Sequence, residues 1–372
     1  MNFEPLQNIL QEATVQGIIP GGAVVVWQKN QQLASLFAGK LEITPNERYV
    51  SENAIWDIAS VTKVLGTTPI ILFMVSKGMI ELDDPIQKYI PTATPGPTIK
   101  NCLQHCSGHL NWKPYFKISQ FVQKSLWGSP KFRQDMLQCV VSEKLQHVPN
   151  EAHVYSDLGF MSLCSVIETI FSQRIDQVWE EILPSQAKQN LMWNPKAQSC
   201  FASIQDRIAA TEMCLLRMKT IVGEVHDLNA YMLDGYSGHA GLFGSAQDVA
   251  AAGNWFLQLY HHGSVDVSKE LVHRFFRDKG VGSHALGWDT PSGELTTASH
   301  LWPKNGVGHL GFTGCSLWIA PDEEVVVAFC SNFVHPIIEG GAMPSATPLA
   351  SRKQLAQLRR DIHATAWTCL FG

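Results

Sequence analysis

Residues 55–63, Ile-Trp-Asp-Ile-Ala-Ser-Val-Thr-Lys, join two kinds of sequence and decide how the fold is built. The stretch before Ser60 is apolar enough for a short strand, and residues 65–75 after it form an apolar run typical of a helix. The junction therefore predicts that a strand leads directly into a helix. Ser60 would begin that helix, and Lys63 would lie one turn later on the same face.

The clearest strand patterns lie near the two ends of the chain. Residues 23–27 and 33–37 are separated by a polar turn, and so are residues 316–320 and 325–330. Two apolar runs joined by a short polar turn predict a β-hairpin. We therefore expect one hairpin near each end of the chain.

Helical spacing of apolar residues occurs at both termini and through the middle third. Residues 3–15 and 352–370 are predicted to form terminal helices. The predicted fold class is α+β: an antiparallel sheet built from both chain ends and flanked by the N- and C-terminal helices, with a mostly helical region inserted. The helical patterns of the inserted region lie at residues 65–75, 158–171, 175–182 and 204–218.

This arrangement predicts two domains. Residues 1–65 and 230–372 would form the α/β sheet domain, and residues 66–229 would form the mostly helical domain. The active site is expected in the cleft between them.

Composition narrows the class of protein. The chain has 372 residues, of which 45% are hydrophobic and 16% charged, so it can build a large core and is not a disordered chain. Its 28 Lys+Arg against 33 Asp+Glu give a net charge of −5, so no nucleic-acid partner is expected. No apolar run reaches the roughly 18 residues that cross a bilayer, so no membrane span is expected.

The cysteines and the first residues bear on location. The nine cysteines show no framework spacing, and residues 1–5, Met-Asn-Phe-Glu-Pro, lack the basic and then apolar order of a secretion signal. Reduced thiols and a cytoplasmic location are the expectation. The oligomeric state stays open.

The first candidate for chemistry is the pattern Ser-x-x-Lys at residues 60–63. A serine hydroxyl is a weak nucleophile until a base takes its proton, and a lysine with a lowered pKa can be that base. Burial and the positive end of a helix both favour a neutral lysine. The structural alternative is a serine that caps a helix, followed by a surface lysine.

Two later segments are candidates for the rest of such a site. Tyr155-Ser156-Asp157 precedes a predicted helix, where Ser156 or Asp157 is also a good cap. Residues 309–314, His-Leu-Gly-Phe-Thr-Gly, lead into a predicted strand, and glycine there lets a backbone or a ligand approach closely. Such an edge can offer an N–H to an oxyanion, although a plain bulge explains the glycines equally well.

Taken together, the three segments resemble a known set of motifs. Their order, Ser60-x-x-Lys63, then Tyr155-x-Asp157, then His309-x-Gly311, is similar to that of the serine β-lactamase and penicillin-binding-protein family. The likeness is to its class C-like branch of β-lactamase-related serine hydrolases, which includes esterases and D-amino-acid peptidases. It extends along nearly the whole chain, through residues 21–26, 78–85, 98–108 and 241–248.

The resemblance implies a role for each matching residue. Ser60 would be the acylated nucleophile, and Lys63 and Tyr155 would share the proton transfers, with the lysine charge favouring the tyrosine phenolate. The backbone N–H groups of Ser60 and Phe312 would form the oxyanion hole. The partner would be a small-molecule acyl substrate with an ester, amide or lactam carbonyl, and water would release the acyl group.

Two motifs depart from the family pattern. The second usually ends in Asn, whereas Asp157 cannot donate an amide hydrogen bond but can hold Lys63 in its charged form. The third is usually Lys-Thr-Gly, whereas His309, Leu310 and Gly311 stand here, and histidine is only partly charged at neutral pH. Both changes favour esters over penicillins. The alternatives are a catalytically silent binding protein that keeps the fold, and a true β-lactamase or D-Ala-D-Ala carboxypeptidase.

Further polar and aromatic residues are candidates for the walls of the substrate site. The resemblance places the loop with His226 and Asn229 at a wall of the substrate cleft, and a hydrogen-bonded scaffold is the alternative. Trp112 and Trp302 lie in loop-like sequence and are candidates for a hydrophobic acyl site.

One group of residues is a candidate metal site. Cys102, His105, Cys106 and His109 bring four candidate ligands close together. Ligands so close along one helix do not readily surround a tetrahedral ion, so no metal is expected. No cofactor is expected either.

Overall fold

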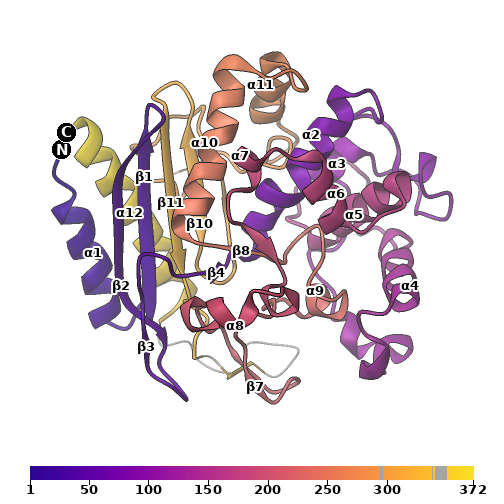
Figure 1. Ribbon diagram of the computed structural model, residues 1–372. Helices are drawn as coiled ribbons and strands as arrows, with labels where there is room; N and C mark the ends of the chain where they lie inside the picture. The colour runs from indigo at the N-terminus through magenta and orange to yellow at the C-terminus, as the bar shows by residue number, and fades with distance from the viewer. Residues whose placement is uncertain (294–295, 337, 340–349) are drawn as a thin grey trace.

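The computed structural model describes residues 1–293, 296–336, 338–339 and 350–372 (Figure 1). Its main sheet has six strands in the order β3-β2-β1-β11-β10-β9, and every neighbouring pair is antiparallel. The pairs β1–β2 and β10–β11 confirm the two predicted hairpins. The strands are β1 (Gly21–Gln28), β2 (Gln31–Glu42), β3 (Arg48–Tyr49), β9 (Val307–Leu310), β10 (Ser316–Ala320) and β11 (Val325–Ser331).

The two ends of the chain meet in the middle of this sheet. β1 pairs with β11, so that Gly22 lies opposite Ser331 and Gln28 lies opposite Val325. Most residues of these two strands are buried, on both faces of the sheet, which explains why the strands are almost continuously apolar. The α+β class and the sheet built from both chain ends are confirmed.

The two terminal helices share one face of the sheet. α1 (Glu4–Val15) and α12 (Arg352–Phe371) lie side by side there, and both chain ends are on this side of the molecule (Figure 1). Leu10 of α1 and Ile362 of α12 are fully buried in one apolar cluster with the strands. The predicted terminal helices are therefore confirmed.

The other face of the sheet is covered by α10 (Ala246–His262). Its first turn is closed by a capping box, in which Ser245 accepts from the Asp248 N–H and Asp248 accepts from the Ser245 N–H. A Cβ on Gly253 would lie 2.8 Å from Leu317 Cδ1, so glycine permits the close approach of helix and sheet.

The middle third is mostly helical, as predicted. Three predicted helices are confirmed as α2 (Thr68–Ser76), α5 (Asp157–Phe171) and α6 (Ile175–Ile182). The described part of the chain also contains shorter or unpredicted helices: α3 (Ile99–Leu103), α4 (Pro130–Val141), α7 (Ser185–Lys188), α8 (Phe201–Ile204), α9 (Leu228–Met232) and α11 (Lys269–Arg277).

The helix after Ser60 forms the centre of the interior. It begins as a 3-10 turn (Ala59–Val61), passes through a π-helical turn (Lys63–Thr67) and continues as α2. The stretch Ala59–Ser76 is long and apolar enough to cross a membrane, but 78% of it is buried inside the protein, as in a core helix. Irregular turns within helices are frequent at functional sites.

A second small sheet holds the start of this helix. β4 (Trp56–Asp57) pairs with β8 (Leu242–Gly244), which also pairs with β5 (Met192–Trp193). The predicted passage from a strand directly into a helix at Ser60 is confirmed.

The predicted helix at residues 204–218 is wrong. The short helix α8 ends at Ile204 and a 3-10 turn follows at Gln205–Arg207. Near the end of the segment lies the strand β6 (Met213–Cys214), which pairs with β7 (Lys219–Thr220) just beyond it. β6 pairs in addition with β12 (Ile338–Glu339), more than 120 residues later in the chain. The apolar spacing in this segment therefore reflects contacts with distant parts of the chain rather than one face of a helix.

Candidate active site

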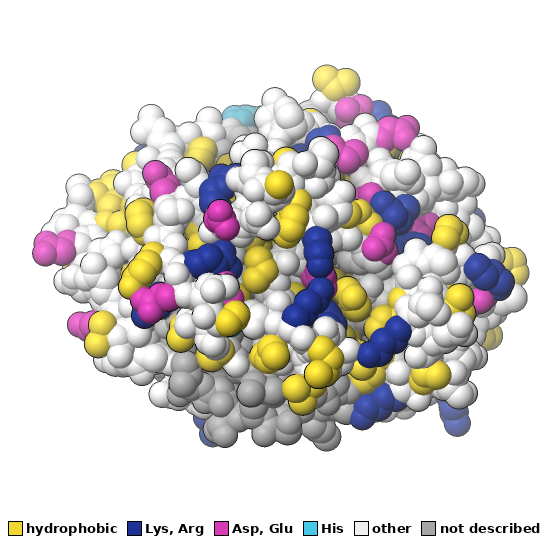
Figure 2. Space-filling view, turned by 60° about the horizontal axis from the view of Figure 1, so that its bottom comes forward, with side chains coloured by type: hydrophobic (Ala, Val, Ile, Leu, Met, Phe, Trp, Pro, Cys, Tyr) yellow, Lys and Arg dark blue, Asp and Glu magenta, His cyan; other side chains and the backbone are white. Residues whose placement is uncertain are grey.

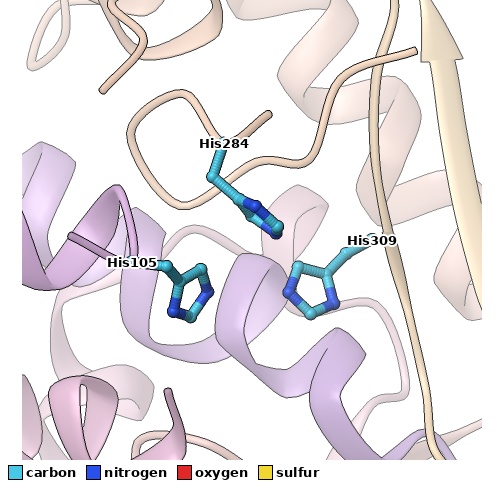
Figure 3. Close-up of side chains that lie close together, drawn as sticks. All are labelled: His105, His284 and His309. Carbon is cyan, nitrogen blue, oxygen red and sulfur yellow. The ribbon is translucent and has the colours of Figure 1, made fainter. Parts of the chain in front are cut away.

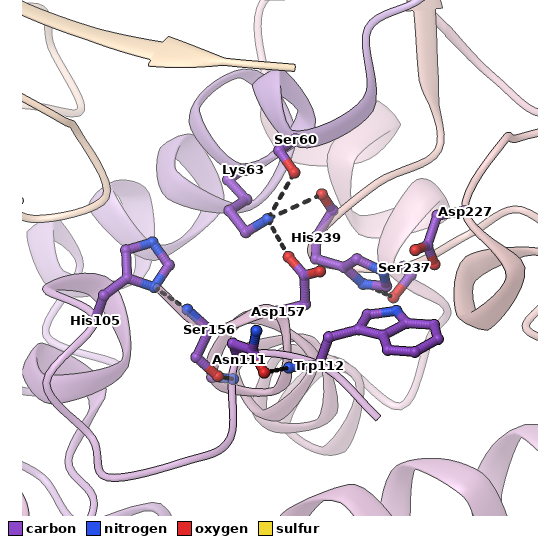
Figure 4. A network of polar contacts seen from close by, with 12 residues as sticks. Ser60, Lys63, His105, Asn111, Trp112, Ser156, Asp157, Asp227, Ser237 and His239 are labelled. Carbon is purple, nitrogen blue, oxygen red and sulfur yellow. Dashed lines mark hydrogen bonds and ion pairs between the residues drawn. The ribbon is translucent and has the colours of Figure 1, made fainter. Parts of the chain in front are cut away.

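Ser60 and Lys63 lie together at the start of the central helix. Lys63 is fully buried, and its Nζ donates to Ser60 Oγ at 3.0 Å, to Asp157 Oδ1 at 2.6 Å and to the His239 carbonyl at 3.4 Å (Figure 4). An ammonium group has three hydrogens, and all three have an acceptor here. The predicted placement of Lys63 on the same face as Ser60 is confirmed.

The ion pair with Asp157 decides the charge of Lys63. Burial on its own lowers the pKa of a lysine, but the charge of Asp157 and its hydrogen bond outweigh burial and raise the pKa of Lys63 above its ordinary value. Lys63 is therefore an ammonium ion in the resting protein. The expectation that Asp157 holds Lys63 charged agrees with this geometry.

Tyr155 stands beside this pair. Lys63 Nζ lies 4.8 Å from the centre of the Tyr155 ring, and His105 packs on the ring at 4.5 Å. The Lys63 charge lowers the pKa of Tyr155, but desolvation and the Asp157 charge prevail and raise it. Lys63 thus favours the phenolate, as expected, but burial and the Asp157 charge outweigh its effect, and Tyr155 keeps its proton at rest.

The second segment forms the predicted helix cap. Ser156 caps α5, since its Oγ accepts from the Gly159 N–H at 3.2 Å. Asp157 is the first residue of the helix, and its backbone N–H donates to the Asn111 carbonyl at 2.8 Å. The cap thus fixes the backbone from which the Asp157 side chain reaches Lys63.

The third segment lies at the end of β9. A Cβ on Gly311 would lie 2.5 Å from the Ile58 carbonyl, so only glycine lets this segment approach the strand before Ser60. The Thr313 hydroxyl donates to the Asp57 carbonyl at 2.7 Å. In the described part of the chain the Phe312 N–H donates to no protein acceptor, which leaves it available to a substrate oxygen.

His309, in the same segment, carries no charge at neutral pH. It is 2% exposed, and burial together with the Lys63 charge lowers its pKa to about 3. Its Nδ1 donates to the Leu310 carbonyl at 2.9 Å, and its Nε2 has no hydrogen-bond partner among the described residues. The sequence predicted a partial positive charge at this position, whereas the structure gives none.

These three segments share one cavity of about 950 Å³. On the face shown in Figure 2, hydrophobic and Lys or Arg side chains gather near the centre. Trp112, Phe116 and Leu228 give the cavity an apolar wall, whereas Trp302 is buried in the cluster beneath α12 and does not line it. The predicted site residues that line the cavity are Ser60, Tyr155, Asp157, His226, His309, Gly311 and Phe312.

The loop with His226 is both a cavity wall and a scaffold. The His226 N–H donates to Asp57 Oδ2 at 2.6 Å, and its ring stacks on Phe312 at 5.4 Å. Burial lowers the pKa of His226 to about 3. Asn229 does not line the cavity: its side chain is buried and donates to the Lys113 carbonyl at 2.9 Å.

Asp227, next to His226, forms a second pair, in which His239 is buried and Asp227 is half-buried. One of its oxygens accepts from the Ala230 N–H, as the cap of α9, and contacts His239 Nε2 at 2.8 Å. The other ring nitrogen of His239 lies 2.9 Å from the Ser237 hydroxyl. The carbonyl of His239 is the third acceptor of Lys63, so this pair supports Lys63 from behind (Figure 4).

Several residues around the cavity were not predicted from the sequence. Arg359 is buried and donates to the carbonyls of Gly311 and Cys315 at 2.7 Å, which fixes the third segment. Arg352 donates to the Phe312 carbonyl at 2.6 Å. His284 also lines the cavity. The arginines lie in a recognisable helix, but nothing in the local pattern of His284 distinguishes it.

His284 joins His105 and His309 in a cluster of imidazoles (Figure 3). One nitrogen of each ring lies within 4.8 Å of the others, a spacing at which three nitrogens can coordinate one metal ion. However, His105 Nδ1 accepts from the Ser156 N–H at 3.0 Å, so Nε2 of the neutral ring carries its hydrogen and has no lone pair to offer. The three rings therefore do not fit a three-histidine metal site.

The four residues that the sequence brings together as candidate ligands do not form one group either. Among the described residues, only His105 of that set belongs to a cluster of three candidate ligands. Other members of the set have different surroundings. Cys102 is buried, and His109 Nδ1 lies 2.9 Å from the Ser107 hydroxyl.

Comparison with known proteins agrees with this geometry. A family model described as Beta-lactamase matches residues 6–347. A putative D-alanyl-D-alanine carboxypeptidase of Escherichia coli (strain K12) is 29% identical over 329 residues, which are 79% of this chain and 74% of that protein. Its counterpart in Escherichia coli O157:H7 is 28% identical over 87% of this chain and 81% of that protein.

Solved structures show the same fold. EstCE1, a hydrolase with promiscuous acyltransferase activity, superposes with a TM-score of 0.71 at 17% identity, over 97% of this chain and 98% of that one. A penicillin-binding-protein homologue from Caulobacter crescentus gives a TM-score of 0.69 at 11% identity, over 98% and 97%. With the family match over nearly the whole chain and with the site described above, this chain belongs to the beta-lactamase family and is a serine hydrolase.

Proposed function

We propose that the protein hydrolyses small acyl compounds through an ester formed on Ser60, and that it prefers esters to penicillins. The observation that carries the first part is the contact of 3.0 Å between Ser60 Oγ and the buried Lys63 Nζ at the floor of an open cavity. A serine hydroxyl in contact with a buried lysine nitrogen is the arrangement that serine acylation needs.

The surrounding groups supply the other parts of the reaction. The N–H groups of Ser60 and Phe312 stabilise the oxyanion of the tetrahedral intermediate. Tyr155 holds its proton at rest and gives it to the leaving group as general acid. Water then enters the cavity and releases the acyl group from Ser60.

The preference for esters rests on His309. Penicillins and D-Ala-D-Ala peptides carry a carboxylate, for which a lysine at this position supplies a permanent positive charge. A buried neutral imidazole does not supply it. The apolar wall formed by Trp112, Phe116 and Leu228 suits a hydrophobic acyl group.

A D-Ala-D-Ala carboxypeptidase is the second candidate, since the two Escherichia coli relatives given above are named putative D-alanyl-D-alanine carboxypeptidases. A catalytically silent binding protein is the third. The presence of Ser60, Lys63 and Tyr155 around one cavity argues against it.

Two further proposals go with this function. The substrate cleft lies between the sheet domain, residues 1–65 and 230–372, and the helical domain, residues 66–229, because both segments contribute residues to the cavity. The location is cytoplasmic, in keeping with nine free cysteines.

The test is covalent labelling followed by a substrate panel. A fluorophosphonate should add once to the wild-type protein and not to Ser60→Ala, as read from the intact mass. Short p-nitrophenyl esters should turn over much faster than a chromogenic cephalosporin or D-amino-acid peptides. Absence of both the adduct and ester turnover would exclude the enzyme, and equal rates for ester and cephalosporin would exclude the preference.

A further inference from the structure

The charge state of Lys63 leaves the reaction without a base. Its three hydrogens are directed at Ser60, Asp157 and the His239 carbonyl, so the nitrogen has no lone pair with which to accept the Ser60 proton. Tyr155 is protonated as well. One of the three hydrogens must leave Lys63 before Ser60 can be deprotonated.

Asp157 is the acceptor best placed to take it. Its Oδ1 lies 2.6 Å from Lys63 Nζ, whereas the His239 carbonyl lies at 3.4 Å and is not basic. The Lys63 side chain is fully buried and the Asp157 side chain is 16% exposed, at the edge of the cavity. An Asn, the usual residue in the second motif of the family, cannot accept a proton from an ammonium ion.

We propose that Ser60, Lys63 and Asp157 form a linear proton relay, in which Asp157 is the terminal acceptor. This inference rests on the proposed function of Ser60. As Ser60 Oγ attacks the carbonyl, its proton passes to Lys63 Nζ while a different Lys63 proton passes to Asp157 Oδ1. The new bond joins Oγ to the carbonyl carbon, the carbonyl π pair moves onto oxygen, and Asp157 ends as the neutral acid.

The proton transfers return each group to its resting protonation state without any outside reagent. When the tetrahedral intermediate collapses, the bond to the leaving oxygen breaks and Tyr155 gives that oxygen its proton. Asp157 then returns its proton to Lys63, and Lys63 passes one to the Tyr155 phenolate. Lys63 is again an ammonium ion, Asp157 a carboxylate and Tyr155 a phenol, so the site is ready for water to repeat the sequence on the acyl-enzyme.

Two variants, each assayed with two esters, distinguish the role of Asp157 as proton acceptor from the role of Tyr155 as general acid. A p-nitrophenyl ester expels a phenolate that leaves without a proton, whereas an ethyl ester of the same acid needs one. Asp157→Asn should slow acylation by about 100-fold or more with both esters. Tyr155→Phe should slow it by a similar factor with the ethyl ester but by less than about 3-fold with the p-nitrophenyl ester.

The matched control is Asp266→Asn, which removes a carboxylate from an exposed ion pair with Lys77 far from the cavity. It should leave acylation unchanged. If Asp157→Asn acylates as fast as the wild type, or faster because the neutral side chain frees Lys63, the relay is wrong. Labelling of Ser60 in the wild type would still stand, so the proposed function and the relay fail separately.

A second measurement needs no variant at all. The wild-type acylation rate, followed in mixtures of H₂O and D₂O, should depend on the deuterium fraction with a curved profile, because two protons move in one step. A straight profile would mean that one proton moves, which would overturn the relay even if Asp157→Asn fails to fold.

Discussion

The cavity has two walls on which burial has opposite effects on the charge of the side chains. On the carboxylate wall, where Asp157, His239 and Asp227 line the cavity and Lys63 lies buried behind them, each nitrogen group contacts a carboxylate within 2.8 Å. On the imidazole wall, where His284 and His309 line the cavity and His105 lies buried behind them, no carboxylate lies within 3.5 Å of any ring nitrogen among the described residues.

The consequences differ although both walls are buried. The pKa of Lys63 rises because Asp157 offsets the loss of hydration. The pKa values of His105 and His284 fall well below their ordinary value, because burial acts there without a close counter-ion, and neighbouring charges add to it. Burial removes charge from a site unless a partner of opposite sign is buried with it.

The largest effect is expected when the ammonium group that pairs with Asp157 is removed. Lys63→Ala should keep the fold and lower the acylation rate by about 1000-fold or more, because nothing else links Ser60 to Asp157. Stopped-flow acylation with a p-nitrophenyl ester measures this. Lys77→Ala, which removes the lysine of an exposed ion pair, is the control. An unchanged rate in Lys63→Ala would show that the base is another group.

The buried, uncharged histidines that line the cavity should make the protein sensitive to acid. His226 and His309 have pKa values of about 3 in the fold, against an ordinary value of 6.5. The unfolded chain therefore binds more protons between these values, so stability is fully present above pH 6.5 and falls as the pH drops towards 3, by about 1.4 kcal/mol per pH unit for each such histidine at most.

Urea unfolding from pH 7 to pH 4 tests this expectation. The free energy of unfolding should decline across that range. The slope of this decline should be smaller in His309→Gln by up to about 1.4 kcal/mol per pH unit, the value for one proton. The slope of the wild type and that of the variant would coincide if His309 were charged in the folded protein.

The smallest effect is expected at the second carboxylate. Asp227→Asn keeps an oxygen that can accept from the Ala230 N–H, but it removes the charge that faces His239. We expect a loss of about 1 kcal/mol in the free energy of unfolding and acylation within about 3-fold of the wild type. A fall in acylation as large as that of Lys63→Ala would mean that both carboxylates of this wall take part in proton transfer.

Much of the fold and the core of the site follow from local sequence. The apolar runs around Ser60 predicted the passage from strand to helix, and the spacing of Ser60 and Lys63 predicted their contact, because residues three apart on a helical turn share one face. The order of the three motifs predicted that Tyr155 and His309 reach the same cavity.

Other parts depended on neighbours that the sequence does not bring close. Residues 204–218 have helical spacing, yet the strand β6 forms there because β7 and β12 offer it partners. His284 enters the cavity from a loop with no motif, and Asn229 turns away from the cavity to reach the Lys113 carbonyl.

The amino-acid sequence by itself thus determined which groups can react, since residue types and their order along the chain specify a nucleophile, a lysine and a tyrosine. Tertiary structure alone decided their charges. Lys63 is an ammonium ion because the start of α5 places Asp157 2.6 Å away, and His309 is neutral because the fold buries it without such a partner. The physical reason is that a protonation state depends on hydration and nearby charge, and both are fixed only when distant segments pack together.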